Sequence, residues 1–180
     1  MLHHIAPPLC HQPLIQKRVS YASLLFTLCG IQIVLAFEWL KMGWGKTIDP
    51  NFAARFPDVL ANFADKNPHA AYAAFLEGFA TAHAEGLAQL ISWGEFAAGT
   101  ALVVCALWII SVRQNPHWAA AVSAAALAAA LFMNANYYFA GGWDKVNQVA
   151  NVVMFWSEFC LLLFHVSVLR PVCKPSSVAL

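Results

Sequence analysis

Residues 149–169 read VANVVMFWSEFCLLLFHVSVL, an apolar stretch long enough to cross a lipid bilayer as one helix. About 20 residues at ~1.5 Å rise per residue span the ~30 Å hydrocarbon core of a membrane. Three polar residues in this stretch, Asn151, Glu158 and His165, recur at intervals of seven. Because a helix drifts only ~20° per heptad, their side chains should share one stripe. An acid near the middle of a membrane is costly and normally faces protein, so this stripe requires neighbouring helices.

The composition of the whole chain is that of a polytopic membrane protein. Of its 180 residues, 61% are hydrophobic and only 11% are charged, whereas soluble domains have roughly 25% charged residues. The formal net charge of +1 argues against nucleic acid as a partner. None of the five cysteines forms a CxxC pair, which argues against a disulfide framework and against a zinc site.

Three further apolar runs, at 19–40, 87–110 and 118–140, have the length of membrane-spanning helices. Short connections should make the last three spans antiparallel neighbours. The first connection, 41–86, is long and rich in charge, and Trp44-Gly45-Lys46 with Asp49-Pro50 predicts that it begins as a turn. Residues 51–64 mix apolar and charged side chains, which predicts a short amphipathic helix at the membrane interface. From His69 the helical pattern continues without a breaker into the second span.

These runs predict an all-α membrane protein, a four-helix transmembrane bundle with a long first extracytoplasmic connection. Residues 19–170 would form the bundle, with cytoplasmic tails at 1–18 and 171–180. The basic residues that closely flank the spans on one side, with no acid among them, are Lys17, Arg18, Arg113, Arg170 and Lys174. The other side also carries five basic residues, but three of them lie deep in the long connection, so the positive-inside rule favours the first side as cytoplasmic. We therefore expect an integral protein of a bacterial inner membrane in contact with the lipid bilayer, with both termini in the cytoplasm.

Polar residues from all four spans fall in the outer half of the predicted bundle. They are Glu38, Glu95, Asn134, Asn136, Asn151 and Glu158. Some of the three carboxyls should be protonated, because low dielectric and mutual repulsion disfavour their charged forms. His165 lies nearer the inner end, where it could simply reach the interface.

Such a group of acids beside Asn, Tyr and Trp donors would suit a quinone. A quinone head group is flat, needs donors to its carbonyls and takes up protons when it is reduced. The alternative is that these groups only join helices by hydrogen bonds, each worth roughly 0.6–2 kcal/mol. That alternative suits Glu158 least, because an acid at mid-membrane is by default a functional candidate.

Other cofactors find little support in the sequence. The chain has no pair of His residues at i,i+4 and no CxxCH, so neither haem nor a di-iron site is indicated. It has no P-loop and no GxGxxG, so nucleotide binding is not indicated either. We expect no metal site, although Met42, Met133 and Met154 could bind copper together with a His or Cys side chain at the ends of their spans.

Several motifs, taken in order, resemble those of a known family. FEWLKMGWGK (37–46) ends the first span, and Asn67-Pro68 precedes the helix that leads into the second. WGEFAAGTAL (93–102) lies within the second span, and NANYYFAGG (134–142), followed by Asn147, ends the third. Together, over roughly residues 18–170, they resemble the DoxX/DoxD family of four-helix membrane proteins.

The resemblance implies a function as well as a fold. The DoxD branch forms the large subunit of thiosulfate:quinone oxidoreductase, which would pass electrons to the quinone pool beside a second subunit. The positions that match recurrent polar residues of the family are Glu38, Lys46, Glu95, Asn136 and Asn147.

The family matches and the depth of the polar residues in the predicted bundle together give the expected site residues. The expected catalytic residues are Glu95 and Glu158, the second from depth alone. The expected quinone-binding residues are Glu38, Lys46, Asn134, Asn136, Asn147 and Asn151. The competing interpretation is a non-catalytic accessory subunit that stabilises a larger respiratory, photosynthetic or oxidase complex in the membrane.

Overall fold

The computed structural model describes the backbone of residues 13–141 and 147–170, and the side chains of residues 21–141 and 149–170. Within these ranges the chain is helical apart from short turns, and it contains no strand. The short connection expected between the third and fourth spans and the tail predicted at 171–180 fall largely or wholly outside the described residues. The first helix begins at Pro13, inside the segment predicted as the N-terminal tail.

Four helices are long and apolar enough to cross a membrane, which confirms the predicted all-α fold with four spans. They are α1 (Pro13–Ile48), α4 (Ala84–Val112), α5 (His117–Gly141) and α6 (Asn147–Leu169). Large apolar side chains on their outer faces are exposed, as contact with lipid requires. Examples are Phe26, Val34, Leu90 and Phe132.

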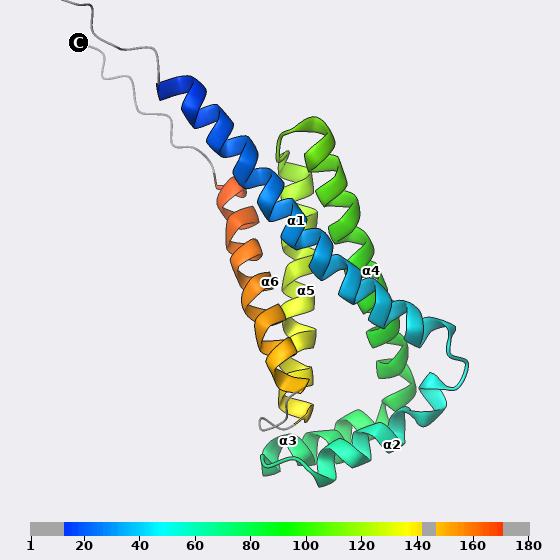
Figure 1. Ribbon diagram of the computed structural model, residues 1–180. Helices are drawn as coiled ribbons and strands as arrows, with labels where there is room; N and C mark the ends of the chain where they lie inside the picture. The colour runs from blue at the N-terminus through cyan, green and yellow to red at the C-terminus, as the bar shows by residue number, and fades with distance from the viewer. Residues whose placement is uncertain (1–12, 142–146, 171–180) are drawn as a thin grey trace, which may run out of the picture.

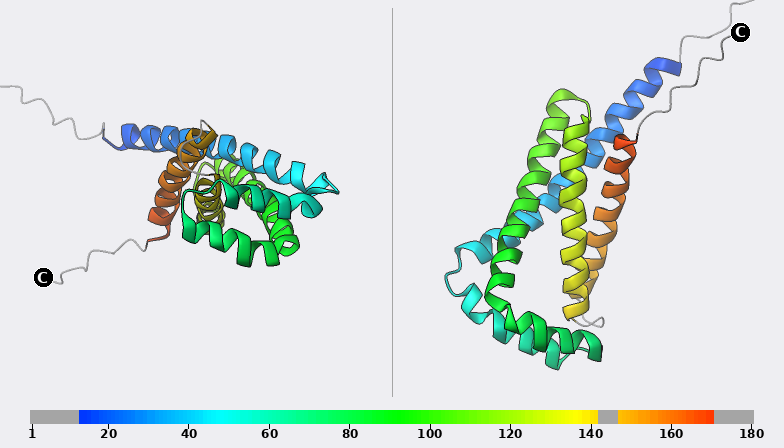
Figure 2. Two further views of the ribbon diagram at one scale, coloured as in Figure 1. Left: turned by 90° about the horizontal axis from the view of Figure 1, so that it is seen from below. Right: turned by 180° about the vertical axis from the view of Figure 1, so that it is seen from behind.

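The four long helices pack as two closely joined pairs. α4, α5 and α6 lie side by side in that order, and α1 crosses them obliquely (Figures 1 and 2). The most extensive contacts join α1 to α4 and α5 to α6. Between the pairs lies a core that includes Trp39, Leu102, Leu127 and Leu161, all at most 1% exposed.

Two glycines allow α1 and α4 to approach closely. A Cβ atom at Gly43 would lie 2.4 Å from the backbone N of Phe96, and one at Gly99 would lie 2.7 Å from the backbone N of Leu40. Small residues at such crossings let helix backbones pack together in lipid.

The turn predicted at Trp44-Gly45-Lys46 is wrong, because α1 continues through these residues and ends at Ile48, next to Asp49-Pro50.

The first connection folds into a helical hairpin that we call the cap. It consists of α2 (Phe52–Asp65), α3 (Ala70–Phe75) and a π-helical turn, η1 (Leu76–Ala80). The cap lies across one end of the bundle, against α4 and α5 (Figures 1 and 2). We refer to this end as the cap side.

The predicted amphipathic helix is present as α2, but its apolar face is covered by protein. Phe56, Leu60 and Ala64 are buried there and pack against Leu76 and Ala80 of η1 and the first turns of α4. The helix expected to continue unbroken from His69 is interrupted. His83 leaves the helical conformation (φ −116°, ψ 22°), and α4 begins only at Ala84.

Two side chains attach the cap to the end of α5. Asn67 Nδ2 donates to the backbone O of Phe139 at 2.8 Å, and so caps a carbonyl in the last helical turn that lacks a helical partner. The Tyr72 hydroxyl donates to the backbone O of Asn136 at 3.2 Å. Burial raises the pKa of Tyr72, so this hydroxyl remains a donor at neutral pH. The Asn67-Pro68 motif thus holds the cap in place as well as starting a helix.

We predict that Gly43→Ala destabilises the protein by about 1–3 kcal/mol, as overpacking does in other cores. The added methyl group would meet the backbone of Phe96, which cannot move away unless α1 and α4 separate. The matched control is Gly30→Ala on the same helix, where a Cβ atom has nothing within 4 Å. Thermal unfolding in a mild detergent should give a lower midpoint for the first variant only, and equal midpoints would contradict the close packing.

Candidate functional site

Glu158, at the middle of α6, is fully buried and accepts a hydrogen bond at each carboxyl oxygen. Trp39 Nε1 of α1 donates to Oε1 at 2.7 Å, and Asn134 Nδ2 of α5 donates to Oε2 at 2.8 Å. Both donors are themselves at most 1% exposed. The acid therefore faces protein, as its depth predicts, and it joins three helices at one point.

Glu95, in α4, is the second fully buried acid, and it lies closer to the cap. The Lys46 ammonium and the Tyr137 hydroxyl both donate to its Oε1 atom. Its Oε2 atom is buried without a hydrogen-bond partner among the described residues. The Lys46 side chain is 26% exposed, so one member of this group reaches the surface.

The two acids are connected through a pair of aromatic side chains. Trp39, the donor to Glu158, packs against Tyr137, the donor to Glu95, with ring centroids 6.5 Å apart. The Lys46 ammonium lies 5.1 Å from the centroid of the Tyr137 ring, a distance at which a cation is attracted to the ring face. The predicted catalytic residues thus belong to one continuous polar and aromatic cluster, together with Lys46 and Asn134.

Two other predicted binding residues, Glu38 and Asn136, make contacts of a different kind. The Glu38 side chain is 43% exposed and pairs with Lys41 of the same helix at 3.6 Å. Asn136 accepts a hydrogen bond from Tyr72 and donates to the backbone O of Phe132, so it serves the attachment of the cap. Asn151 is partly buried, and the side chain of Asn147 lies outside the described residues.

A second polar cluster, in the half of the bundle away from the cap, was not predicted. Gln32 Nε2 donates to the backbone O of Leu102 at 2.9 Å and to Ser123 Oγ at 3.2 Å. His165 Nε2 lies 2.8 Å from Gln32 Oε1, and Asn115 Nδ2 lies 3.2 Å from His165 Nδ1. This pattern fits a neutral His165 that carries its proton on Nε2. His165 is 1% exposed and does not reach the interface.

The sequence did contain a signal for Gln32 and Trp39, the two residues of α1 that were missed. Gln32, Trp39 and Lys46 recur at intervals of seven, as Asn151, Glu158 and His165 do in α6. Since Gln32 contacts His165 and Trp39 contacts Glu158, the two stripes meet with α1 and α6 antiparallel. A heptad of polar and aromatic residues in the first span would therefore have identified the partners of the fourth.

Metal ligands do not gather in the described part of the chain, where no three His, Cys, Asp or Glu side chains are placed to share an ion. Met42, Met133 and Met154, considered above as copper ligands, pack against the hydrophobic core. No protein-family model matches the chain, and no match is found among curated proteins or solved structures. The likeness to the DoxX/DoxD family stays a prediction from motifs.

We predict that Trp39→Phe destabilises the protein by about 1–3 kcal/mol, because Glu158 Oε1 then lacks its donor at a fully buried site. Trp93→Phe is the control, since Trp93 is 55% exposed. A double-mutant cycle with Glu158→Leu, which removes the acceptor, separates the lost hydrogen bond from the lost ring volume. Unfolding free energies that are additive in this cycle would show that the hydrogen bond contributes nothing.

Proposed function

We propose that this chain is the membrane subunit of a quinone-linked oxidoreductase of the thiosulfate:quinone type. In this proposal thiosulfate is oxidised at a partner subunit and supplies two electrons. A quinone accepts them together with two protons and leaves as quinol. The role of this chain is to hold the quinone head group and to deliver protons to it.

The observation that carries the proposal is the environment of Glu95. One oxygen of this buried carboxyl accepts from Lys46 and Tyr137, and the other has no partner among the described residues. An unpaired acceptor in a buried site is costly unless something binds to it. A carboxyl that meets the surface through a partly exposed lysine is suited to collect protons from water and pass them inward.

Separate roles follow for the residues around Glu95. Lys46 admits protons from the cap side, Glu95 carries them on its Oε2 atom to a quinone carbonyl, and the Tyr137 hydroxyl orients this carboxyl by donating to Oε1. Glu158 was predicted to be catalytic as well, but both of its oxygens are occupied. We assign it to positioning, because it orients Trp39, on which the Tyr137 ring packs.

We predict that Glu95→Gln and Tyr137→Phe each lower thiosulfate-dependent quinone reduction at least tenfold, because general acid–base contributions are roughly 10²–10⁴-fold. Tyr137→Phe removes only the hydroxyl and keeps the ring beside Trp39. The matched control is Glu77→Gln, which neutralises an exposed acid of η1. Turnover is measured on purified complex, and the unfolding midpoint of each variant is measured in parallel to exclude loss of structure.

The alternative function, a structural subunit of a larger membrane complex, is favoured by Glu158. Its carboxyl has both oxygens paired and joins α1, α5 and α6, which is the behaviour of a helix connector. Full turnover in Glu95→Gln and Tyr137→Phe, with loss of assembled complex in Glu158→Leu, would establish this role and refute the catalytic one.

We also propose a bacterial inner membrane as the location, with the cap outside and both termini in the cytoplasm. Arg113 and Ala61 lie at opposite ends of the bundle, since Arg113 ends α4 and Ala61 is in α2 (Figure 1). Phosphatase fusions should be active after Ala61 and inactive after Arg113. Fluorescent-protein fusions at the same two positions should give the reverse result. Activity of one reporter at both positions would contradict the topology.

A further inference from the structure

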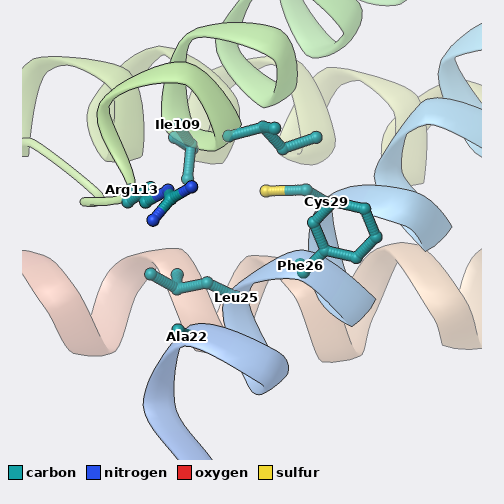
Figure 3. A pocket seen from close by; sticks show the side chains of 7 residues that line it. Ala22, Leu25, Phe26, Cys29, Ile109 and Arg113 are labelled. Atoms are coloured by element: carbon teal, nitrogen blue, oxygen red, sulfur yellow. The ribbon is translucent and has the colours of Figure 1, made fainter. Parts of the chain in front are cut away.

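A groove of about 330 Å³ opens between α1 and the end of α4, on the side of the bundle away from the cap (Figure 3). Its walls include Ala22, Leu25, Phe26 and Cys29 of α1, Ile109 of α4, and Arg113. Ala22, Phe26 and Cys29 follow one another at helical spacing, so they form one stripe along α1. The groove is apolar except at one end, where the Arg113 guanidinium lies over it (Figure 3).

Arg113 occupies an unusual position for an arginine. It ends α4 in the left-handed conformation (φ 52°, ψ 30°), and it is the only residue other than glycine with positive φ in the described part of the chain. Glycine is the usual residue there, because a side chain strains this conformation. Such strain at an exposed helix end is a reason to look for a function of the side chain.

The charge of Arg113 is also unbalanced. Within the described ranges no acid forms an ion pair with it; the three ion pairs found there join Lys41 to Glu38, Lys46 to Glu95, and Arg55 to Asp49. The candidate membrane span of α4 ends at Val112, so Arg113, the next residue, would lie near the lipid head groups. An unpaired cation at this depth attracts anionic lipid.

We propose that this groove binds one anionic phospholipid. The Arg113 guanidinium would hold the phosphate, and the first part of an acyl chain would lie along the stripe of Ala22, Phe26 and Cys29. Arginine suits this role because its planar donors match phosphate oxygens in pairs. The groove volume is near the lower end of the ~300–1,000 Å³ typical of ligand sites, which suits part of a lipid and not all of it.

This inference is independent of the proposed quinone chemistry. The groove lies at the opposite end of the bundle from Lys46, Glu95 and Tyr137, and it shares no residue with that cluster. A bound lipid there would fill the space between α1 and α4 at the end where no cap covers them. It would therefore stabilise the oblique crossing of α1 at the end that lies away from the cap.

The test is native mass spectrometry of the full chain, purified in a mild detergent and titrated with phosphatidylglycerol or phosphatidylcholine of identical acyl chains. We expect one phosphatidylglycerol to be retained at least about fivefold more strongly than phosphatidylcholine, the effect of one arginine at an anionic surface. Arg113→Gln should abolish this preference, and Arg113→Lys should keep most of it. Glycerol phosphate, which has no acyl chain, should not compete.

Two further variants make the result decisive. Arg55→Gln removes an arginine at the cap side that already pairs with Asp49, and it should leave the lipid preference unchanged. Ala22→Phe fills the groove from α1 without changing charge, and it should weaken retention of phosphatidylglycerol. Equal binding of the two lipids by the unmodified chain would overturn the proposal. A preference that persists in Arg113→Gln, or binding unaffected by Ala22→Phe, would also overturn it.

Discussion

The hydrogen-bonded carboxyl of Glu158 is the constraint on which the arrangement of the helices depends. An acid at this depth cannot face lipid without a large free-energy cost, so α6 must present it to protein. Each of its oxygens needs a donor, and the two donors come from different helices, Trp39 from α1 and Asn134 from α5. These bonds fix the rotation of α6 about its axis and the height at which α1 crosses it. A purely apolar seam between the same helices would specify neither so closely.

The close approach of α1 and α4 determines where the second acid finds its partners. Gly43 lies against the backbone of Phe96, the residue that follows Glu95. Lys46, almost one turn beyond Gly43, is thereby brought to the Glu95 carboxyl, and Tyr137 reaches it from α5. A buried ion pair is stable only when the geometry and the remaining hydrogen bonds are good. Glu95 Oε2 has no hydrogen-bond partner among the described residues, so this buried pair is not fully satisfied. A ligand or a water molecule would bind at this atom.

Much of this structure could be predicted from the sequence, and the misses have physical reasons. Hydropathy gave the four spans, and the heptad of Asn151, Glu158 and His165 gave the buried face of α6. Trp44-Gly45-Lys46 was misread as a turn, because a glycine does not by itself end a membrane helix, and α1 continues through Gly45 to Ile48. Glu38 and Glu95 were both placed in the outer half of the bundle, but only the structure shows that one faces outward and the other is buried. Depth along a helix is readable from sequence, whereas rotation about its axis depends on the partner helices.

The matching heptads of α1 and α6 explain why both polar clusters exist. Gln32 pairs with His165, and Trp39 pairs with Glu158. One register between the two antiparallel helices therefore forms both contacts. Shifting α1 by a single residue would break both pairs and leave buried polar atoms unsatisfied at two depths. The register therefore has far fewer acceptable alternatives than an apolar interface would allow. Because Trp39 and Lys46 belong to the same stripe of α1, this register also sets the position of the lysine that reaches Glu95. The position of Lys46 in the candidate site therefore also depends on the pairing of Gln32 with His165, a contact in the opposite half of the bundle.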